Sequence, residues 1–284
     1  MIPSAFEYMR ATSIDEALAK LKAAGPGGKL IAGGHSLVPL MKLRLSEPGV
    51  LIDIGRIADL AGIRERDGKI VIGAATVHHD VATSPLLRER CPVVAEAAAT
   101  IGDPQVRNRG TIGGSVAHAD PAADMPAVLV ALNAEIHVKG PNGWRVVLAP
   151  EFFTDLFTVN MAPDEILAAI QFAPVTTAAY AKLRQRASHY AIVGVAAALA
   201  VSGGTIASAR IGLTGATSHA QRLTRVEEAL AGRPLSKEAI ASAAELAGQG
   251  LTGINSDIHA SAEYRRAMVR VFTRRALEGA MARA

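Results

Sequence analysis

Cysteine is nearly absent from this sequence of 284 residues, which contains only Cys91. A disulfide bond within the chain is therefore excluded. An iron–sulfur cluster held by this chain alone is excluded as well, because such clusters typically need about four cysteine ligands. Cys91 precedes Pro92 at the start of an alanine-rich segment, so we expect a buried side chain there and not a nucleophile.

Aromatic residues are scarce too, at 4% of the sequence. The net charge of +4 would suit a nucleic-acid-binding protein, but neither an aromatic stacking motif nor a basic tract accompanies it. On a helix, the arginines near the C-terminus would lie on more than one face, so we expect a solvated surface or a contact with a partner subunit, and no nucleic-acid site. These arginines are Arg265, Arg266, Arg270, Arg274 and Arg275.

Long apolar runs are also missing. The longest candidate, residues 191–201, falls short of the roughly 18–20 residues that cross a bilayer. The first residues lack the basic start, apolar middle and cleavage site of a signal peptide, so we expect a cytoplasmic protein without a transmembrane segment. The eight histidines do not stand at ligand spacing with cysteines or carboxylates, and we expect no metal site.

The first third of the chain has the pattern of a small α/β unit. Ser13, followed three residues later by Glu16, predicts the start of a helix. Short apolar segments at 29–32 and 50–54 predict two strands, with a further short helix between them. The order of strand, helix and strand indicates a subdomain over about residues 1–55.

A second pattern covers residues 56–175, with a strand at 69–73, an alanine-rich helix at 93–101 and a hairpin around Asn142-Gly143. Residues 165–172 fit a strand or a short helix. Beyond residue 175 the texture changes to three strands followed by helices, for which Ser236 and Ser261 are N-cap candidates. We therefore predict an N-terminal domain over 1–175 and a C-terminal domain over 176–284. The three strands are expected at 179–184, 191–201 and 205–213.

Two glycine-rich loops, at residues 32–37 and 111–117, carry the first sign of a ligand. Each contains a Gly-Gly pair next to hydroxyl residues. Glycine lacks a Cβ, so the backbone can approach an anion closely, and successive N–H groups can form a concave anion site. One such pair would indicate only a tight turn, whereas two predict binding of a pyrophosphate from more than one side. The spacing alone leaves the ligand undecided.

The common nucleotide-binding motifs are not present. There is no G-x-G-x-x-G and no G-x-x-x-x-G-K-[ST], so a nicotinamide or ATP site lacks its usual support. Asp120 and Asp124 could form a general acid–base pair. Alternatively, one could cap the following helix while the other binds hydroxyl groups of a cofactor. We favour this second interpretation, with Asp124 as the cofactor contact, and we predict no catalytic residue.

These residues together resemble the FAD-binding medium subunits of molybdenum hydroxylases, the xanthine dehydrogenase family, and most closely those of the carbon monoxide dehydrogenase type. The resemblance rests on the two loops and on residues 103–107, 120–126, 180–184 and 262–266. It implies an α+β fold. A two-subdomain FAD-binding domain of the vanillyl-alcohol oxidase (PCMH) type would be followed by a three-stranded antiparallel sheet and a helical bundle.

The resemblance also implies a set of FAD-binding residues. The two loops would wrap the pyrophosphate, Ile101 and Tyr190 would lie at the flavin ring, and Lys182 would lie near its polar edge. Ser115 stands where the family often has asparagine; it can donate a hydrogen bond but lacks an amide carbonyl. The full set is Lys29, Leu30, Ile31, Ala32, Gly33, Gly34, His35, Ser36, Leu37, Ile101, Gly110, Thr111, Gly113, Gly114, Ser115, Ala117, Asp124, Lys182 and Tyr190.

In such a complex this chain would be an electron relay. A large subunit with a molybdopterin cofactor would oxidise the substrate. A small subunit with two [2Fe-2S] clusters would deliver electrons to FAD, and a quinone, NAD or another acceptor would remove them. The resemblance implies a dimer of heterotrimers in the cytoplasm, at the cytoplasmic face of the membrane. Two alternatives are a self-contained FAD-dependent oxidoreductase and a scaffold that binds no FAD. Carbon monoxide, heterocycles, purines and aldehydes all stay open as substrates.

Overall fold

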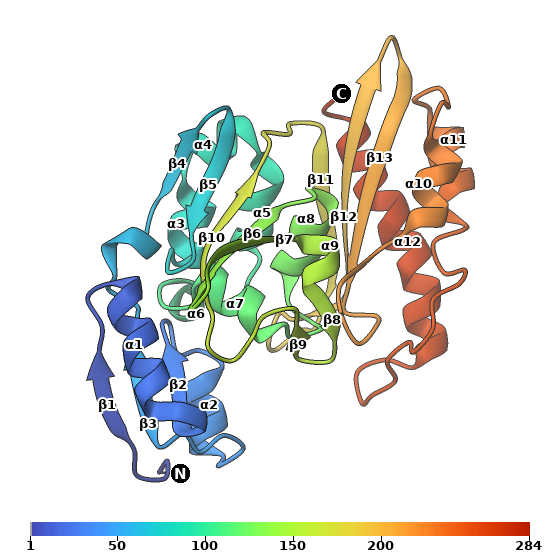
Figure 1. The fold of residues 1–284 in the computed structure, drawn as a ribbon. Coiled ribbons are helices and arrows are strands. Elements are labelled where there is room, and N and C mark those ends of the chain that lie inside the picture. Colours follow the sequence, from blue (N-terminus) through green and yellow to red (C-terminus); the bar gives the residue numbers. More distant parts are fainter. Residues whose placement is uncertain (1) are drawn as a thin grey trace.

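The computed structural model describes residues 2–284 and contains three larger β-sheets. Figure 1 shows them in a row, with the N-terminal unit at one end, the C-terminal unit at the other and the central sheet with its helices between them. The order of units in space follows the order in the sequence. The fold is therefore mixed α and β, as predicted.

The N-terminal unit is a three-stranded parallel sheet in the order β1-β3-β2, covered by short helices. The strands predicted at 29–32 and 50–54 are confirmed, whereas β1 was missed because it is short and mostly exposed. Its elements are β1 (Glu7–Arg10), α1 (Ile14–Ala24), η1 (Gly25–Gly27), β2 (Gly28–Ile31), α2 (Leu37–Lys42) and β3 (Val50–Asp53).

Helix α1 begins where the sequence predicts. The Ser13 hydroxyl accepts the Glu16 N–H at 3.1 Å, which satisfies one of the free amides at the helix start. The Glu16 carboxylate accepts the Thr12 N–H at 2.7 Å, one residue earlier than a standard capping box requires.

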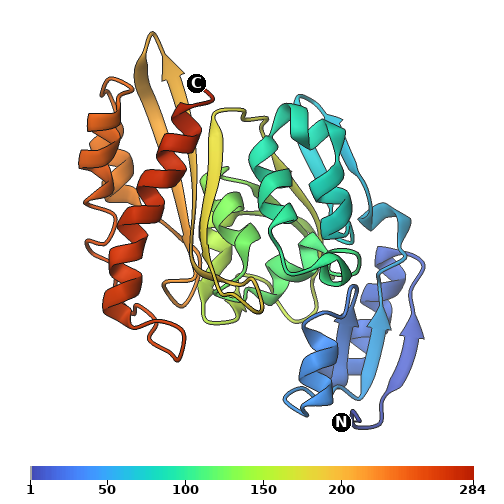
Figure 2. The same cartoon turned by 180° about the vertical axis from the view of Figure 1, so that it is seen from behind.

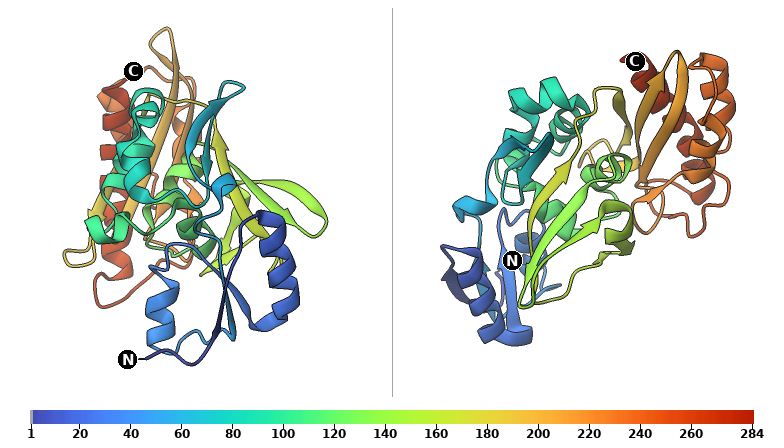
Figure 3. Two further views of the ribbon diagram at one scale, coloured as in Figure 1. Left: turned by 90° about the vertical axis from the view of Figure 1, so that its left-hand side faces the viewer. Right: turned by 45° about the horizontal axis from the view of Figure 1, so that its top comes forward.

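The central unit is an antiparallel sheet in the order β4-β5-β10-β6-β7. Residues 166–172 form a strand, and the hairpin predicted at Asn142-Gly143 is confirmed as β6–β7, which projects from the sheet in Figure 3. The strands are β4 (Ile63–Arg66), β5 (Lys69–Gly73), β6 (Glu135–Gly140), β7 (Gly143–Leu148), β8 (Phe153–Asp155), β9 (Thr158–Val159) and β10 (Ile166–Phe172), with β8 and β9 pairing separately.

Helix α8 (Asp124–Ala131) connects the central unit to the C-terminal unit. The residues of α8 are buried throughout, and it packs against β12 and β13 of the C-terminal sheet, so it joins the two units. The helices of the central unit are η2 (Ala58–Leu60), α3 (His78–Thr83), α4 (Pro85–Arg90), α5 (Pro92–Ala99), α6 (Pro104–Arg107), α7 (Ile112–His118), α8 (Asp124–Ala131) and α9 (Ala149–Phe152).

The C-terminal unit confirms the three predicted strands and adds a short fourth, in the order β11-β12-β13-β14. Ser236 and Ser261 cap their helices as predicted, and the long helix α12 lies along the sheet in Figure 2. The elements are β11 (Ala178–Arg184), β12 (Ala191–Ser202), β13 (Thr205–Thr214), β14 (Gln221–Arg222), α10 (Thr224–Leu230), α11 (Lys237–Ala244) and α12 (Ala262–Met281).

One expectation about the C-terminal arginines is wrong. Arg265 is not on a solvated face but is 3% exposed. Its guanidinium donates to the carbonyls of Ile192 at 2.6 Å and Gly215 at 2.9 Å and pairs with Asp257 at 2.7 Å. Arginine suits this position because its fork of donors satisfies several carbonyl groups that would otherwise be buried without partners.

Cys91 is fully buried as predicted, and burial raises the pKa of its thiol to about 12. Among residues 2–284, no helix is both long enough and apolar enough to cross a membrane. The same residues hold no group of three or more histidine, cysteine or acidic side chains that could bind a metal ion.

Candidate cofactor site

The first glycine-rich loop leaves strand β2 and enters helix α2 with its amides free. Within residues 2–284, the N–H groups of Gly33, Gly34, His35 and Ser36 donate to no protein atom. Carbonyl groups of the loop form the hydrogen bonds that stabilise it. The Gly34 carbonyl accepts the Val38 N–H at 2.9 Å, and His35 Nδ1 lies 3.1 Å from the Gly33 carbonyl oxygen. Four successive free donors on a partly exposed loop are what an anion such as a pyrophosphate requires.

The second glycine-rich loop is different, because its amides are already used. The Ile112 N–H donates to the Thr76 carbonyl at 2.9 Å and the Gly113 N–H to the Ala74 carbonyl at 2.8 Å. The Gly114 N–H donates to the Thr111 hydroxyl, which caps helix α7. The expectation of a second free backbone site is therefore wrong.

The two loops touch each other at Gly33. A Cβ at this position would overlap the carbonyl oxygen of Arg109, which precedes Gly110 and the second loop. Glycine is thus required here by close approach of two backbones. The fold brings together segments about 75 residues apart in sequence, so a ligand on the first loop lies beside the second.

His78 contacts the backbone that leads into the second loop, although the sequence gives no sign of a role for it at the site. Its N–H donates to the Gly110 carbonyl at 2.9 Å, and its ring is 4% exposed. Burial, with smaller contributions from Arg107 and His35, lowers the pKa of His78 to about 4. The ring is therefore neutral near pH 7, and within the described chain its Nδ1 has no hydrogen-bond partner.

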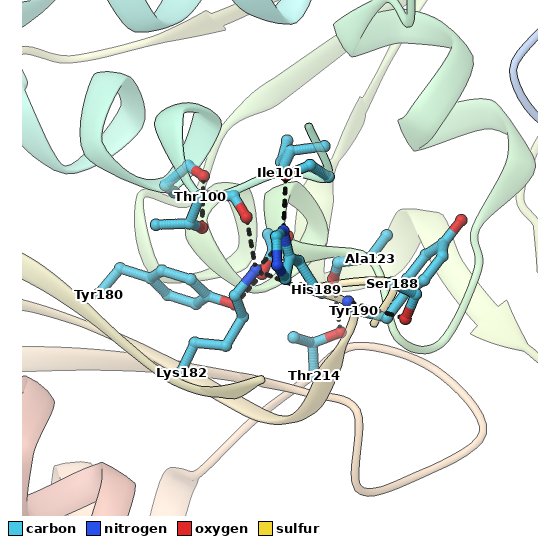
Figure 4. Close-up of polar contacts among 12 residues, drawn as sticks. Thr100, Ile101, Ala123, Tyr180, Lys182, Ser188, His189, Tyr190 and Thr214 are labelled. Atoms are coloured by element: carbon cyan, nitrogen blue, oxygen red, sulfur yellow. Dashed lines mark hydrogen bonds and ion pairs between the residues drawn. The ribbon is translucent and has the colours of Figure 1, made fainter. Parts of the chain in front are cut away.

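A buried polar cluster forms where α8 meets β11. Asp124, the first residue of α8, accepts the Tyr180 hydroxyl at 2.5 Å and pairs with Lys182 at 2.9 Å. Figure 4 shows the side chains of Tyr180 and Lys182 close to each other. Burial raises the pKa of Asp124, and Lys182 and Tyr180 oppose that rise. Burial, together with the Asp124 charge, raises the pKa of Tyr180 well above its usual value. The cluster fixes one positive and one negative group in a place nearly closed to water.

Ile101 lies on a short segment, residues 100–102, whose three carbonyls are all hydrogen-bonded by side chains. The Thr100 carbonyl accepts from Lys182 Nζ at 3.0 Å, and the Ile101 carbonyl accepts from Arg107 Nη1 at 2.9 Å. The Gly102 carbonyl lies 2.8 Å from His189 Nδ1. These contacts cap the C-terminal end of α5, where cationic groups are favoured by the helix dipole. The position of Ile101 is therefore fixed from both domains.

Tyr190 ends the loop at residues 185–190 and is 46% exposed. Burial of its hydroxyl, with Asp120 and Asp124, raises the pKa of Tyr190. Its side chain helps to line a cavity of about 250 Å³, together with Asp120 and Arg265. Asp120 itself accepts the Ala122 N–H at 2.8 Å, so it shapes the turn before α8. Tyr190 is therefore partly accessible to a ligand.

The predicted site residues thus form two groups. Residues 29–37 and 110–117 make up the first group, in which the amides without a protein partner among residues 2–284 are those of residues 33–36. The four other residues make up the second group, held together by Tyr180, Arg107 and His189, which the sequence did not predict. Free amides suit phosphate groups, whereas an apolar side chain, an aromatic ring and a charged pair suit a flavin ring. The second group is Ile101, Asp124, Lys182 and Tyr190.

Comparison with known proteins assigns both parts of the chain. Residues 4–175 match the family described as FAD binding domain in molybdopterin dehydrogenase, and residues 178–280 match the CO dehydrogenase flavoprotein C-terminal domain. The carbon monoxide dehydrogenase medium chain of Hydrogenophaga pseudoflava is 43% identical, over 100% of this chain and 99% of that protein. The 6-hydroxypseudooxynicotine dehydrogenase complex subunit alpha of Paenarthrobacter nicotinovorans is 40% identical, over 100% and 97%.

A solved structure has the same fold over the whole chain. It belongs to the carbon monoxide dehydrogenase from Hydrogenophaga pseudoflava that lacks the Mo-pyranopterin moiety of the molybdenum cofactor. It superposes with a TM-score of 0.96 at 43% identity and covers 100% of both chains. With both halves matched and the cofactor-type donors in place, this chain belongs to the family of FAD-binding medium subunits of molybdopterin dehydrogenases.

Proposed function

We propose that this chain holds one FAD and relays electrons from the iron–sulfur clusters of a small partner subunit to an external acceptor. A large partner subunit with a molybdopterin cofactor oxidises the substrate. The observation that carries the proposal is the run of four free amides at residues 33–36, in the same chain as the cluster around Asp124 and Lys182. Each group alone would suit other ligands, whereas the pair suits a flavin dinucleotide.

In this proposal each group of residues has a separate task. The amides of residues 33–36 and the hydroxyls of Ser36 and Ser115 bind the pyrophosphate, and FAD supplies the exchange between one-electron and two-electron transfer. Lys182 places a fixed positive charge at the polar edge of the ring. Asp124, held by Tyr180, keeps that charge in position. Ile101 and Tyr190 exclude water from the ring.

The site proposed for FAD includes all the residues that the sequence predicts. The proposed division of the chain is into domains 1–175 and 176–284. The structure limits what two of the site residues can do. Gly113 and Gly114 would act through their small size and not through their amides, because those amides are already bonded. The proposed set is Lys29, Leu30, Ile31, Ala32, Gly33, Gly34, His35, Ser36, Leu37, Ile101, Gly110, Thr111, Gly113, Gly114, Ser115, Ala117, Asp124, Lys182 and Tyr190.

The proposed assembly is a dimer of heterotrimers in the cytoplasm, at the cytoplasmic face of the membrane, with a quinone, NAD or another acceptor. Relatives named as medium chains or complex subunits support a multi-subunit enzyme. Two relatives of nearly equal identity belong to complexes named for carbon monoxide and for 6-hydroxypseudooxynicotine. The substrate is therefore a property of the large subunit and not of this chain.

The cofactor released from the purified protein tests this function directly. The chain, produced with its partner subunits, is denatured and the released flavin is separated by chromatography. We expect FAD, about one per chain, and no turnover of carbon monoxide or heterocycles by the chain alone. Stoichiometric FMN, or an intact complex without flavin, would contradict the proposal. Robust turnover by the isolated chain would instead support a self-contained oxidoreductase.

A further inference from the structure

The loop at residues 185–190 reaches from the C-terminal sheet to the end of helix α5. Gln185 organises it internally, because its side-chain oxygen accepts the N–H of Ala187 at 2.6 Å and its own N–H donates to the Tyr190 carbonyl at 2.8 Å. Two contacts join the loop to its surroundings through one residue. The His189 ring contacts the Gly102 carbonyl at 2.8 Å, and the His189 carbonyl accepts Lys182 Nζ at 2.8 Å (Figure 4).

The ring contact has a defined polarity. The Gly102 carbonyl oxygen can only accept a hydrogen bond, so Nδ1 of His189 carries the hydrogen and donates it. The backbone of His189 adds a second requirement, since its φ is +62°. Few residues adopt this left-handed conformation readily, and Asn, Asp and His are the usual non-glycine exceptions. Position 189 therefore needs both a donor at Nδ1 and tolerance of positive φ.

From this geometry we infer that His189 is a positioning residue for the flavin ring. Its hydrogen bond ties the loop that presents Tyr190 to the segment that presents Ile101, and so it fixes the gap between these two side chains. This inference rests on the proposed function, because it assumes that Ile101 and Tyr190 lie against the ring. Lys182 reaches both sides of the same gap, through the carbonyls of Thr100 and His189. The His189 ring thus adds a direct hydrogen bond between the loop and the segment at residues 100–102, which Lys182 connects only indirectly.

Three substitutions separate the two requirements at position 189. His189→Gly keeps the positive φ and removes the donor. His189→Asn keeps both, because the amide nitrogen of asparagine is attached to Cγ as Nδ1 is in histidine. Ala187→Gly loosens the same exposed loop without touching the bond to Gly102, and it serves as the matched control. All three are made in the full chain, purified with its partner subunits and its FAD.

Access to the flavin is measured by collisional quenching of flavin fluorescence with iodide, and loop opening by hydrogen exchange of residues 185–190. A lost hydrogen bond of ordinary strength shifts an equilibrium about two- to tenfold, so we expect His189→Gly to raise both quantities by that factor. His189→Asn and Ala187→Gly should stay within about twofold of the unaltered protein, at equal FAD content.

Two results would overturn the inference while leaving the proposed function intact. One is FAD-loaded His189→Gly protein with unaltered quenching and exchange, which would mean that the bond to Gly102 does not hold the loop. The other is an asparagine variant as perturbed as the glycine variant, which would mean that the donor is not what matters. An unaltered complex that contains no FAD would instead overturn the proposed function, and the inference with it.

Discussion

The two glycine-rich loops look alike in sequence but differ in what their backbones do. Within the described residues 2–284, the four amides of residues 33–36 donate to no protein atom, whereas the amides of residues 112–114 are bonded to Thr76, Ala74 and Thr111. The first loop therefore has donors free for a ligand, whereas the amides of the second loop stabilise the protein around it. In both loops a glycine allows another part of the backbone to approach closely. Gly33 lies against Arg109, and Gly113 lies against Ala74.

The largest effect is expected at the second loop, where Gly113→Val should strongly destabilise the folded state. A side chain there would overlap the Cβ and carbonyl of Ala74 in the core, and overpacking against fixed backbone costs about 3 kcal/mol or more. Urea unfolding monitored by circular dichroism measures the loss. A Gly113→Val protein that unfolds at the same urea concentration as the parent would show that this loop has room to move.

Gly33→Val should instead remove FAD while leaving a folded chain. A Cβ at Gly33 pushes the first loop away from Arg109, and losing two bonds from amides to a charged phosphate weakens binding by about 100-fold or more. Titration of the flavin-free chain with FAD gives the affinity, and circular dichroism monitors the fold. If this variant retained its full FAD content, or if it were unfolded, the first loop would not differ from the second in binding FAD without supporting the fold.

Acid should weaken the support of the second loop through His78. The folded pKa of about 4 lies below the value of 6.5 expected when unfolded, so the unfolded state takes up a proton first and stability falls between pH 6.5 and 4. At pH 5 the loss is about 2 kcal/mol relative to pH 8. Urea unfolding at both pH values should show that His78→Phe lacks this part of the loss. The control is His79→Phe, at an exposed neighbour, and an equal pH dependence in both variants would contradict this account of His78.

The smallest effects come from a pair of hydroxyl substitutions with opposite consequences. Thr111→Val removes the N-cap of α7 and should lower stability by about 1 kcal/mol. Ser36 caps nothing through its side chain, so Ser36→Ala should leave stability within about 0.5 kcal/mol but weaken FAD binding about tenfold. Parallel unfolding and FAD titrations compare them. If only Ser36→Ala lowered stability, this would contradict the assignment of Ser36 to FAD binding and of Thr111 to stability.

Local features of the fold were predictable because their causes lie within a few residues. The caps at Ser13, Ser236 and Ser261 each accept the N–H three residues on, and the β6–β7 hairpin depends on its own turn. Strands β1 and β14 were missed because β1 is mostly exposed and β14 has only two residues, so neither has a recognisable apolar pattern. Each becomes a strand by pairing, β1 with β3 and β14 with β13.

The mixed α and β fold, the helix caps, the turns and the two glycine-rich segments could all be predicted from the sequence. The folded structure was needed to show that, among residues 2–284, the amides of the first segment donate to no protein atom whereas those of the second do. It was also needed to show that Tyr180, Arg107 and His189 contact the residues of the candidate site. Whether an amide is free depends on whether the fold brings a carbonyl group within hydrogen-bond distance of it. That carbonyl group can belong to any part of the chain. The carbonyl groups of Ala74 and Thr76 lie more than 30 residues before the second loop, and no pattern within that loop records where the fold will place them.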